Sequence, residues 1–237
     1  ETITTLESAN KKNCKVIAFS SGGMIESFCT KNNIEFRKLP QIHSPRASFP
    51  SYVYSILKTL NSIIPITKQD IINSLEQLEH TYEEISSTNL DDSNPSVNLA
   101  NWITGTPVIY YPHGLETVAI RFKNSLQENA KTHAISENVV ESSHNGIVSW
   151  ERPSSMVPIM IEGKDDHIKT KERWKILREY FEVNNIKYNK IQSVDGNILS
   201  KVMCLIYTLD YSTIYYAVQL GIDPSPIRSI DFIKDRL

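Results

Sequence analysis

The sequence predicts an α/β protein in which parallel sheets are flanked by helices, arranged as two layers along the chain. Short β-rich apolar runs alternate with helical patterns, an order typical of parallel sheets. The alternation occurs on both sides of the segment 91–95, Asp-Asp-Ser-Asn-Pro, which breaks the chain. We therefore expect a boundary near residues 90–96, with an incomplete first layer before it and a complete second layer after it.

The first layer is predicted from two short apolar runs. Residues 16–20 and 35–39 have the composition of buried strands. The turn Ser21-Gly22-Gly23 follows the first of these strands and has two interpretations. Its backbone amides could approach a phosphate at a helix N-terminus, or the turn could simply need the conformational freedom of glycine.

The second layer is predicted after the break. Apolar residues at helical spacing span 68–90, and the acidic residues among them are typical of a solvated helix face. Beyond the break, we expect helices at 97–103, 114–129, 170–184, 198–220 and 227–237, and strands at 106–111, 156–161 and 186–192.

Composition and charge argue against several partners. The 237-residue chain has 25 basic and 27 acidic residues, so no basic excess favours nucleic acid or an acidic membrane surface. Its longest apolar runs are too short to cross a bilayer, and its start does not resemble a signal peptide. Three scattered cysteines, Cys14, Cys29 and Cys204, favour reduced thiols and a cytoplasmic location.

No cofactor or metal site is predicted. The sequence contains no GxGxxG, Walker-type, GxSxG or HExxH motif. The six histidines show no ligand spacing with a cysteine or carboxylate cluster. The loop Asp165-Asp166-His167 could touch a metal, but we favour an ordinary polar loop.

Glu128 and His144 are the candidate catalytic pair. Glu128 lies at the end of the helix predicted over 114–129, where the helix dipole disfavours further negative charge and so favours a proton acceptor. Glutamate and histidine together commonly move protons on a bound substrate. Taken alone the pair is weak evidence, because a glutamate on such a helix usually lies at the surface.

Five short motifs resemble the bifunctional phosphoglucose/phosphomannose isomerases, which are sugar-isomerase (SIS) proteins. They are Ser-Gly-Gly at 21–23, Pro-Arg-Ala at 45–47, Glu-Asn-Ala-Lys at 128–131, His-Asn at 144–145, and a closing Asp-Pro-x-Pro…Ile-Asp-x-x-Lys from Asp223 to Lys234. They span nearly the whole chain in the family's order. Ser143 and Gly146 depart from the family, where Asn and Glu are frequent, but neither change removes a catalytic group.

The resemblance implies an SIS-type fold with a truncated first domain. Residues 1–66 would be the C-terminal remnant of the first SIS domain, 67–96 a helical linker, and 97–237 the second SIS domain. The start at Glu1 looks like the tail of the family's phosphate loop, so we expect an N-terminally trimmed chain that alone binds and isomerises sugar phosphate poorly.

The resemblance also implies a reaction, the interconversion of glucose 6-phosphate or mannose 6-phosphate with fructose 6-phosphate through an enediol. Glu128 would be the base, His144 and Lys234 would assist ring opening, and Arg46 would stabilise the enediolate. Arg46 and the turn 21–23 would bind substrate. No cofactor would be needed, and His144 would act in the neighbouring subunit of a homodimer.

Two other functions stay open at this point. A non-catalytic SIS module that senses sugar phosphates would lack the Glu/His/Lys set, which is present here. An amidotransferase-type isomerase domain acting on amino sugars should carry its own C-terminal signature, and the sequence shows none.

Overall fold

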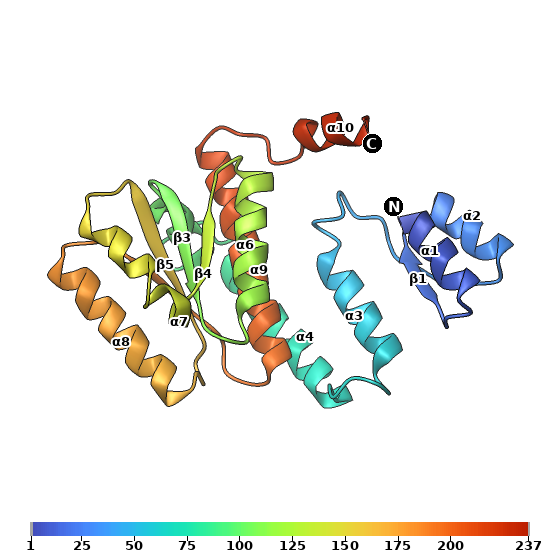
Figure 1. Ribbon diagram of the computed structural model, residues 1–237, viewed down its shortest axis with the longest axis horizontal. Helices are drawn as coiled ribbons and strands as arrows, with labels where there is room; N and C mark the ends of the chain where they lie inside the picture. Colours follow the sequence, from blue (N-terminus) through green and yellow to red (C-terminus); the bar gives the residue numbers. More distant parts are fainter. Residues whose placement is uncertain (1, 237) are drawn as a thin grey trace. The chain divides into compact units, whose positions relative to one another are not determined.

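The computed structural model describes residues 2–236, and the chain divides into two compact units. The first unit extends to Thr67 and the second begins at Lys68. Both contain parallel strands flanked by helices (Figure 1), so the predicted fold class is confirmed. Glu1, the residue likened to the tail of a phosphate loop, lies outside the described residues.

The first unit contains a two-stranded parallel sheet. Its elements are α1 (Thr2–Lys11), β1 (Ile17–Ser20), α2 (Met24–Lys31), β2 (Glu35–Lys38) and α3 (Phe49–Leu60). The strands pair in register from Ile17 opposite Glu35 to Ser20 opposite Lys38. Leu6 of α1, Ala18 of β1 and Cys29 of α2 form its small buried core.

The second unit contains a four-stranded parallel sheet in the order β4-β3-β5-β6. The chain runs through α4 (Lys68–Ile85), α5 (Pro95–Trp102), β3 (Thr106–Tyr111), α6 (Glu116–Asn129), β4 (Ile135–Asn138), α7 (Val139–Ser142), the 3-10 helix η1 (Gly146–Glu151), β5 (Met156–Glu162), α8 (Ile168–Val183), β6 (Asn189–Gln192), α9 (Ile198–Gln219) and α10 (Arg228–Lys234).

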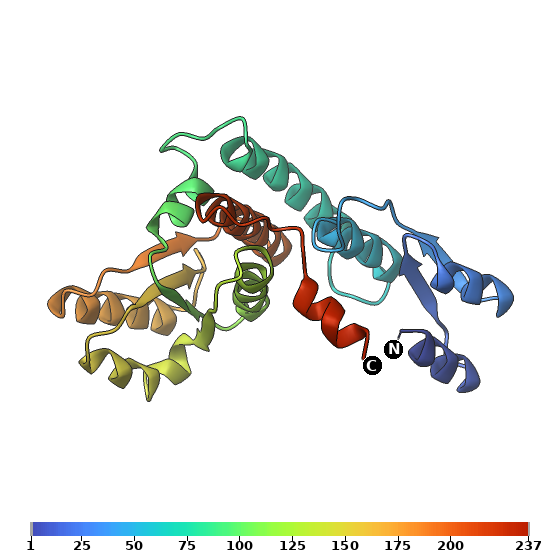
Figure 2. The same cartoon turned by 90° about the horizontal axis from the view of Figure 1, so that it is seen from above.

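Helices cover both faces of this sheet, with α8 on one side and the pair α6 and α9 on the other (Figure 2). The α8 side holds an aromatic core in which Trp150 packs edge-on against Phe181, with ring centroids 5.6 Å apart. The indole Nε1 of Trp150 donates to the hydroxyl of Tyr110 at 2.8 Å, so the buried polar atoms of this core are paired.

Residues 68–96 pack on α9 of the second unit. The Tyr215 hydroxyl of α9 donates to the carbonyl of Ile85 at 2.6 Å, and the Ser96 hydroxyl donates to the carbonyl of Thr208 at 2.7 Å. The predicted break at 91–95 is a capped turn within this unit, where the side chain of Asn94 accepts from the amides that open α5. The division between the units therefore falls before α4, at the start of the segment 67–96 that the sequence analysis assigns to a linker, and the break at 91–95 lies inside the second unit.

The strand β4 and the two short helices after it were not predicted. β4 lies at the edge of the sheet and reads Ile-Ser-Glu-Asn, with one apolar residue. Such a strand lacks the apolar run that marks β3 and β5. Within residues 2–236, no helix is long and apolar enough to cross a bilayer.

Candidate functional site

Glu128 lies at the amino edge of the four-stranded sheet. It is in the last turn of α6, which leaves the carboxyl end of β3 and returns to the start of β4 at Ile135. Its side chain is half-buried. The end of α6 lies close to the segment that leads into α10, and α7 lies at the other end of the sheet (Figure 1).

His144 lies at the opposite, carboxyl edge of the same sheet. It follows β4 and α7, its side chain is exposed, and its backbone amide donates to the carbonyl of Glu141 at 2.9 Å. The 14 residues of α6 separate the two edges by roughly 20 Å. The structure therefore does not bring Glu128 and His144 of one chain together.

Gly146 shows how tightly the chain folds just beyond His144. A Cβ added at this glycine would lie 2.5 Å from a carboxylate oxygen of Glu137. A larger residue here, such as the glutamate frequent in the family, would require Glu137 to move. The departure from the family's pattern at Gly146 thus fits the local packing of this loop.

Glu128 lines a cleft of about 680 Å³ between the end of α6 and the C-terminal segment. One wall comes from residues 124–131 and the other from residues 226–230. The ammonium of Lys131 joins the two walls, since it donates to the carbonyls of Glu128 and Pro226 at 2.5 and 2.8 Å. Lys234 is exposed in the last turn of α10, the helix that begins in the second wall.

A polar cluster fixes α6 on α9 beneath the cleft. Arg121 of α6 donates to Asp210 of α9 through Nε at 2.9 Å and through Nη2 at 2.6 Å, and Ser125 donates to the same carboxylate at 2.7 Å. One turn further, the amide of Asn129 donates to the Thr213 hydroxyl at 2.8 Å. Glu128 therefore lies on a helix end held by four side-chain hydrogen bonds to α9.

Burial is the largest influence on the pKa of Asp210. It raises the pKa of Asp210, although the charge of Arg121 and hydrogen bonds from Ser125 and Arg121 oppose the rise; the charge of Glu128 adds to it. Residues Arg121, Ser125 and Asn129 recur every four positions, so they share one face of α6. That spacing is the sequence signal for a polar stripe, but the sequence does not identify its partner on α9.

Arg121→Met is expected to lower the free energy of unfolding by about 2–3 kcal/mol at pH 8, because it leaves the Asp210 carboxylate largely buried without its guanidinium. The pair has side chains only 19% and 21% exposed. The loss should be smaller at pH 5. In the variant the folded protein binds the Asp210 proton more tightly than the unfolded chain, so proton uptake restores stability as the pH falls.

Urea unfolding at both pH values measures this effect. Lys169→Met is the matched control, because it breaks an exposed pair with Glu172 in the same unit and should cost less than about 0.5 kcal/mol at either pH. Equal losses for Arg121→Met at pH 5 and pH 8 would contradict the assignment to Asp210.

The turn Ser21-Gly22-Gly23 belongs to the first unit, where it joins β1 to α2. Gly22 and Gly23 have φ of 139° and 71°, a backbone region that favours glycine. A Cβ on Gly22 would lie 2.9 Å from a carboxylate oxygen of Glu26, which is paired with Lys38. Backbone geometry thus accounts for both glycines, and substrate binding by this turn stays a prediction.

Arg46 also belongs to the first unit and is half-buried, in the loop between β2 and α3. Because β1 and β2 are parallel, this loop and the turn 21–23 leave the same, carboxyl edge of the sheet. The first unit therefore places two of the predicted substrate-binding segments at one edge. The role of Arg46 stays a prediction.

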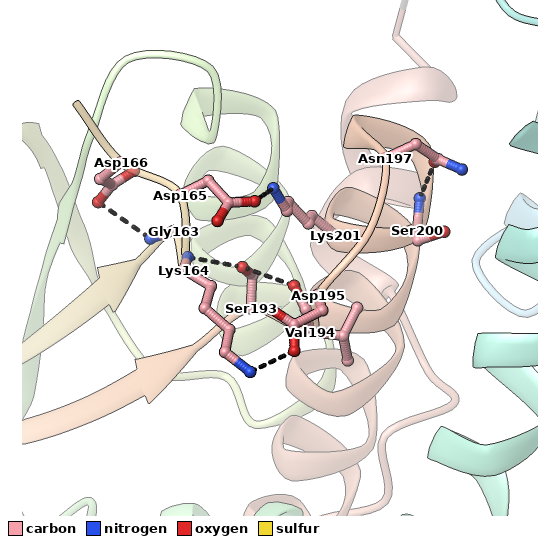
Figure 3. A network of polar contacts seen from close by, with 10 residues as sticks. All are labelled: Gly163, Lys164, Asp165, Asp166, Ser193, Val194, Asp195, Asn197, Ser200 and Lys201. Atoms are coloured by element: carbon pink, nitrogen blue, oxygen red, sulfur yellow. Dashed lines mark hydrogen bonds and ion pairs between the residues drawn. The ribbon is translucent and has the colours of Figure 1, made fainter.

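The charged loop after β5 is engaged in bonds of its own (Figure 3). Asp165 pairs with Lys201, Lys164 pairs with Asp195, and Asp166 accepts from the amide of Gly163 at 3.0 Å. In the part of the chain that the structure describes, no group of three or more His, Cys, Asp or Glu is placed to hold a metal. The polar-loop interpretation accounts for these carboxylates.

The parallel sheets flanked by helices, with Glu128 in a cleft at the edge of the second sheet, match an α/β fold of the SIS type. A solved tagatose-6-phosphate ketose/aldose isomerase from Escherichia coli has this fold, with a TM-score of 0.71 and 12% identity. The alignment covers 94% of this chain and 66% of that one.

Sequence comparisons identify the family. Residues 92–237 match the bacterial phospho-glucose isomerase C-terminal SIS domain, and the chain belongs to this family. A bifunctional phosphoglucose/phosphomannose isomerase from Caldicellulosiruptor bescii is 28% identical over the whole chain, which spans 72% of that relative. A D-glucosamine-6-phosphate 4-epimerase from Sulfolobus acidocaldarius is 27% identical with the same coverage. The family predicted from the five motifs is thereby confirmed.

Proposed function

We propose that this protein is an aldose–ketose isomerase that interconverts glucose 6-phosphate or mannose 6-phosphate with fructose 6-phosphate. Family membership supports the reaction class, and the observation that carries the proposal is the position of Glu128 in the cleft beside the C-terminal segment. A carboxylate there has access to a bound ligand while α9 holds its helix in place. We further propose a cytoplasmic location, supported by three free cysteines.

In this reaction Glu128 acts as the base that moves the proton between C2 and C1 of the open-chain sugar. His144 and Lys234 assist opening of the sugar ring at its oxygen and O1. The guanidinium of Arg46 stabilises the negative charge that develops on the enediolate. The turn 21–23 contributes backbone amides to substrate binding. These steps need no metal or redox cofactor.

We propose that the working protein is a homodimer in which His144 completes the site of the partner subunit. The separation of Glu128 and His144 at opposite edges of one sheet supports this arrangement, because one chain cannot apply both groups to one bound sugar. A two-fold interface is self-complementary, so it would form both sites at once.

The proposal is tested by incubating the full-length protein with glucose 6-phosphate, mannose 6-phosphate and glucosamine 6-phosphate. Fructose 6-phosphate formed from the first two supports the isomerase. A second candidate activity, C4 epimerisation of glucosamine 6-phosphate, is included because a relative carries that name. Epimerisation alone, or binding without turnover as expected for a regulatory module, would overturn the proposal.

A further inference from the structure

Lys131 occupies an unusual backbone position for a lysine. Among residues 2–236, four non-glycine residues have positive φ: Asn13, Asn33, Lys131 and Asn185. Each lies two positions beyond the last residue of a helix, namely α1, α2, α6 and α8. Asparagine and glycine suit this left-handed position, whereas lysine is disfavoured there. Lys131 is the exception, and strained backbone of this kind is often retained at functional sites.

The hydrogen bonds at the end of α6 also differ from those at the other three helices. After each asparagine, the next amide bonds to the carbonyl five residues back: Cys14 to Ala9, Ile34 to Cys29, and Ile186 to Phe181. After Lys131, the amide of Thr132 bonds to Leu126, six residues back. The carbonyl of Glu128 receives the ammonium of Lys131.

The same ammonium reaches across the cleft to the carbonyl of Pro226, 95 residues further along the chain. Pro226 belongs to the wall opposite Glu128, directly before α10. No residue of α10 (Arg228–Lys234) is buried, so this helix has little apolar packing within the second unit. A cation shared by two carbonyls makes charge-assisted bonds, which are stronger than neutral ones.

We propose that Lys131 is a positioning residue that clamps the segment leading into α10 against the end of α6. The clamp sets the width of the cleft and holds the helix that carries Lys234 in register with Glu128. The inference rests on the proposed function, because it takes Glu128 and Lys234 as the groups that act on the sugar. Lys131 itself contacts none of the reacting atoms. It also explains why lysine occupies a backbone position that suits glycine or asparagine.

Lys131→Gly tests the clamp without harming the helix end, because glycine relieves the left-handed backbone while removing the ammonium. We expect an unchanged or higher melting temperature, together with amide hydrogen exchange about tenfold faster in residues 227–234. The turnover number should fall by between about 10- and 100-fold with KM nearly unchanged, as expected for a misplaced catalytic group. Lys131→Arg should restore most of both properties, because a guanidinium can also donate to the two carbonyls.

Asn185→Gly is the matched control, since it makes the same backbone change at the end of α8 and should alter neither the exchange of residues 227–234 nor turnover. Wild-type exchange or wild-type turnover in Lys131→Gly would overturn the proposal. Failure of the proposed function looks different: the wild-type protein would not isomerise hexose phosphates at all, while the exchange of α10 would still respond to Lys131→Gly.

Discussion

Glu128→Gln is expected to remove nearly all isomerase turnover from the full-length protein while substrate binding survives. The amide matches the carboxylate in size, so the cleft and the hydrogen bonds between α6 and α9 keep their geometry, but the proton acceptor is lost. Loss of a general base typically costs on the order of 10²–10⁴ in rate. Steady-state kinetics should therefore show a collapsed kcat with KM changed by less than about threefold.

Glu116→Gln is the matched control for this experiment. It makes the same chemical change at the other end of α6, next to the carboxyl edge of the sheet. Turnover should stay close to that of the wild-type protein. If Glu128→Gln kept more than about a tenth of wild-type turnover, the base would have to be another residue, and Glu141 would be the first to test.

The second large effect is expected when two inactive variants are mixed. Glu128→Gln and His144→Ala should each be nearly inactive alone. If the two residues act in different subunits, a mixed dimer has one site with both lesions and one site with neither. Random exchange at equal amounts makes half of the dimers mixed, so about a quarter of wild-type activity should return.

Subunit exchange must be verified independently, for example with two affinity tags that copurify only in mixed dimers. If Glu128 and His144 worked in one chain, every site would keep a lesion and mixing would restore nothing. The positions of the two residues at opposite edges of one sheet favour recovery. No recovery after verified exchange would place His144 outside the partner's site.

The central strands of the second sheet could be predicted because they are buried on both faces. Residues 106–111 and 156–161 form continuous apolar runs between turns, and both are strands of one parallel sheet. The edge strand β4 could not be predicted, because three of its four residues are polar. Nor could helical periodicity show that α4 packs on α9, since an amphipathic pattern reveals that a helix has a buried face but not what covers it.

The sequence also predicted the secondary structure around one candidate site residue. The apolar spacing over 114–129 placed Glu128 at the end of a helix, and α6 ends at Asn129. The placement of His144 at the edge of the sheet opposite Glu128 depends on β4, and the sequence analysis did not predict this strand. The pair between Arg121 and Asp210 joins residues 89 positions apart, and no local pattern encodes such a contact. The position of Lys131 was predicted as part of a motif, but its backbone conformation and its bond to Pro226 required the structure.

The most direct test of the proposed reaction is proton NMR of glucose 6-phosphate and mannose 6-phosphate incubated with the full-length protein in D₂O. Transfer of a proton between C2 and C1 through a base predicts that both sugars convert to fructose 6-phosphate. Deuterium should enter at C1 of the ketose and C2 of the aldoses, and Glu128→Gln should suppress both conversion and labelling. Absence of conversion by the wild-type protein, or equally fast labelling with Glu128→Gln, would contradict the account.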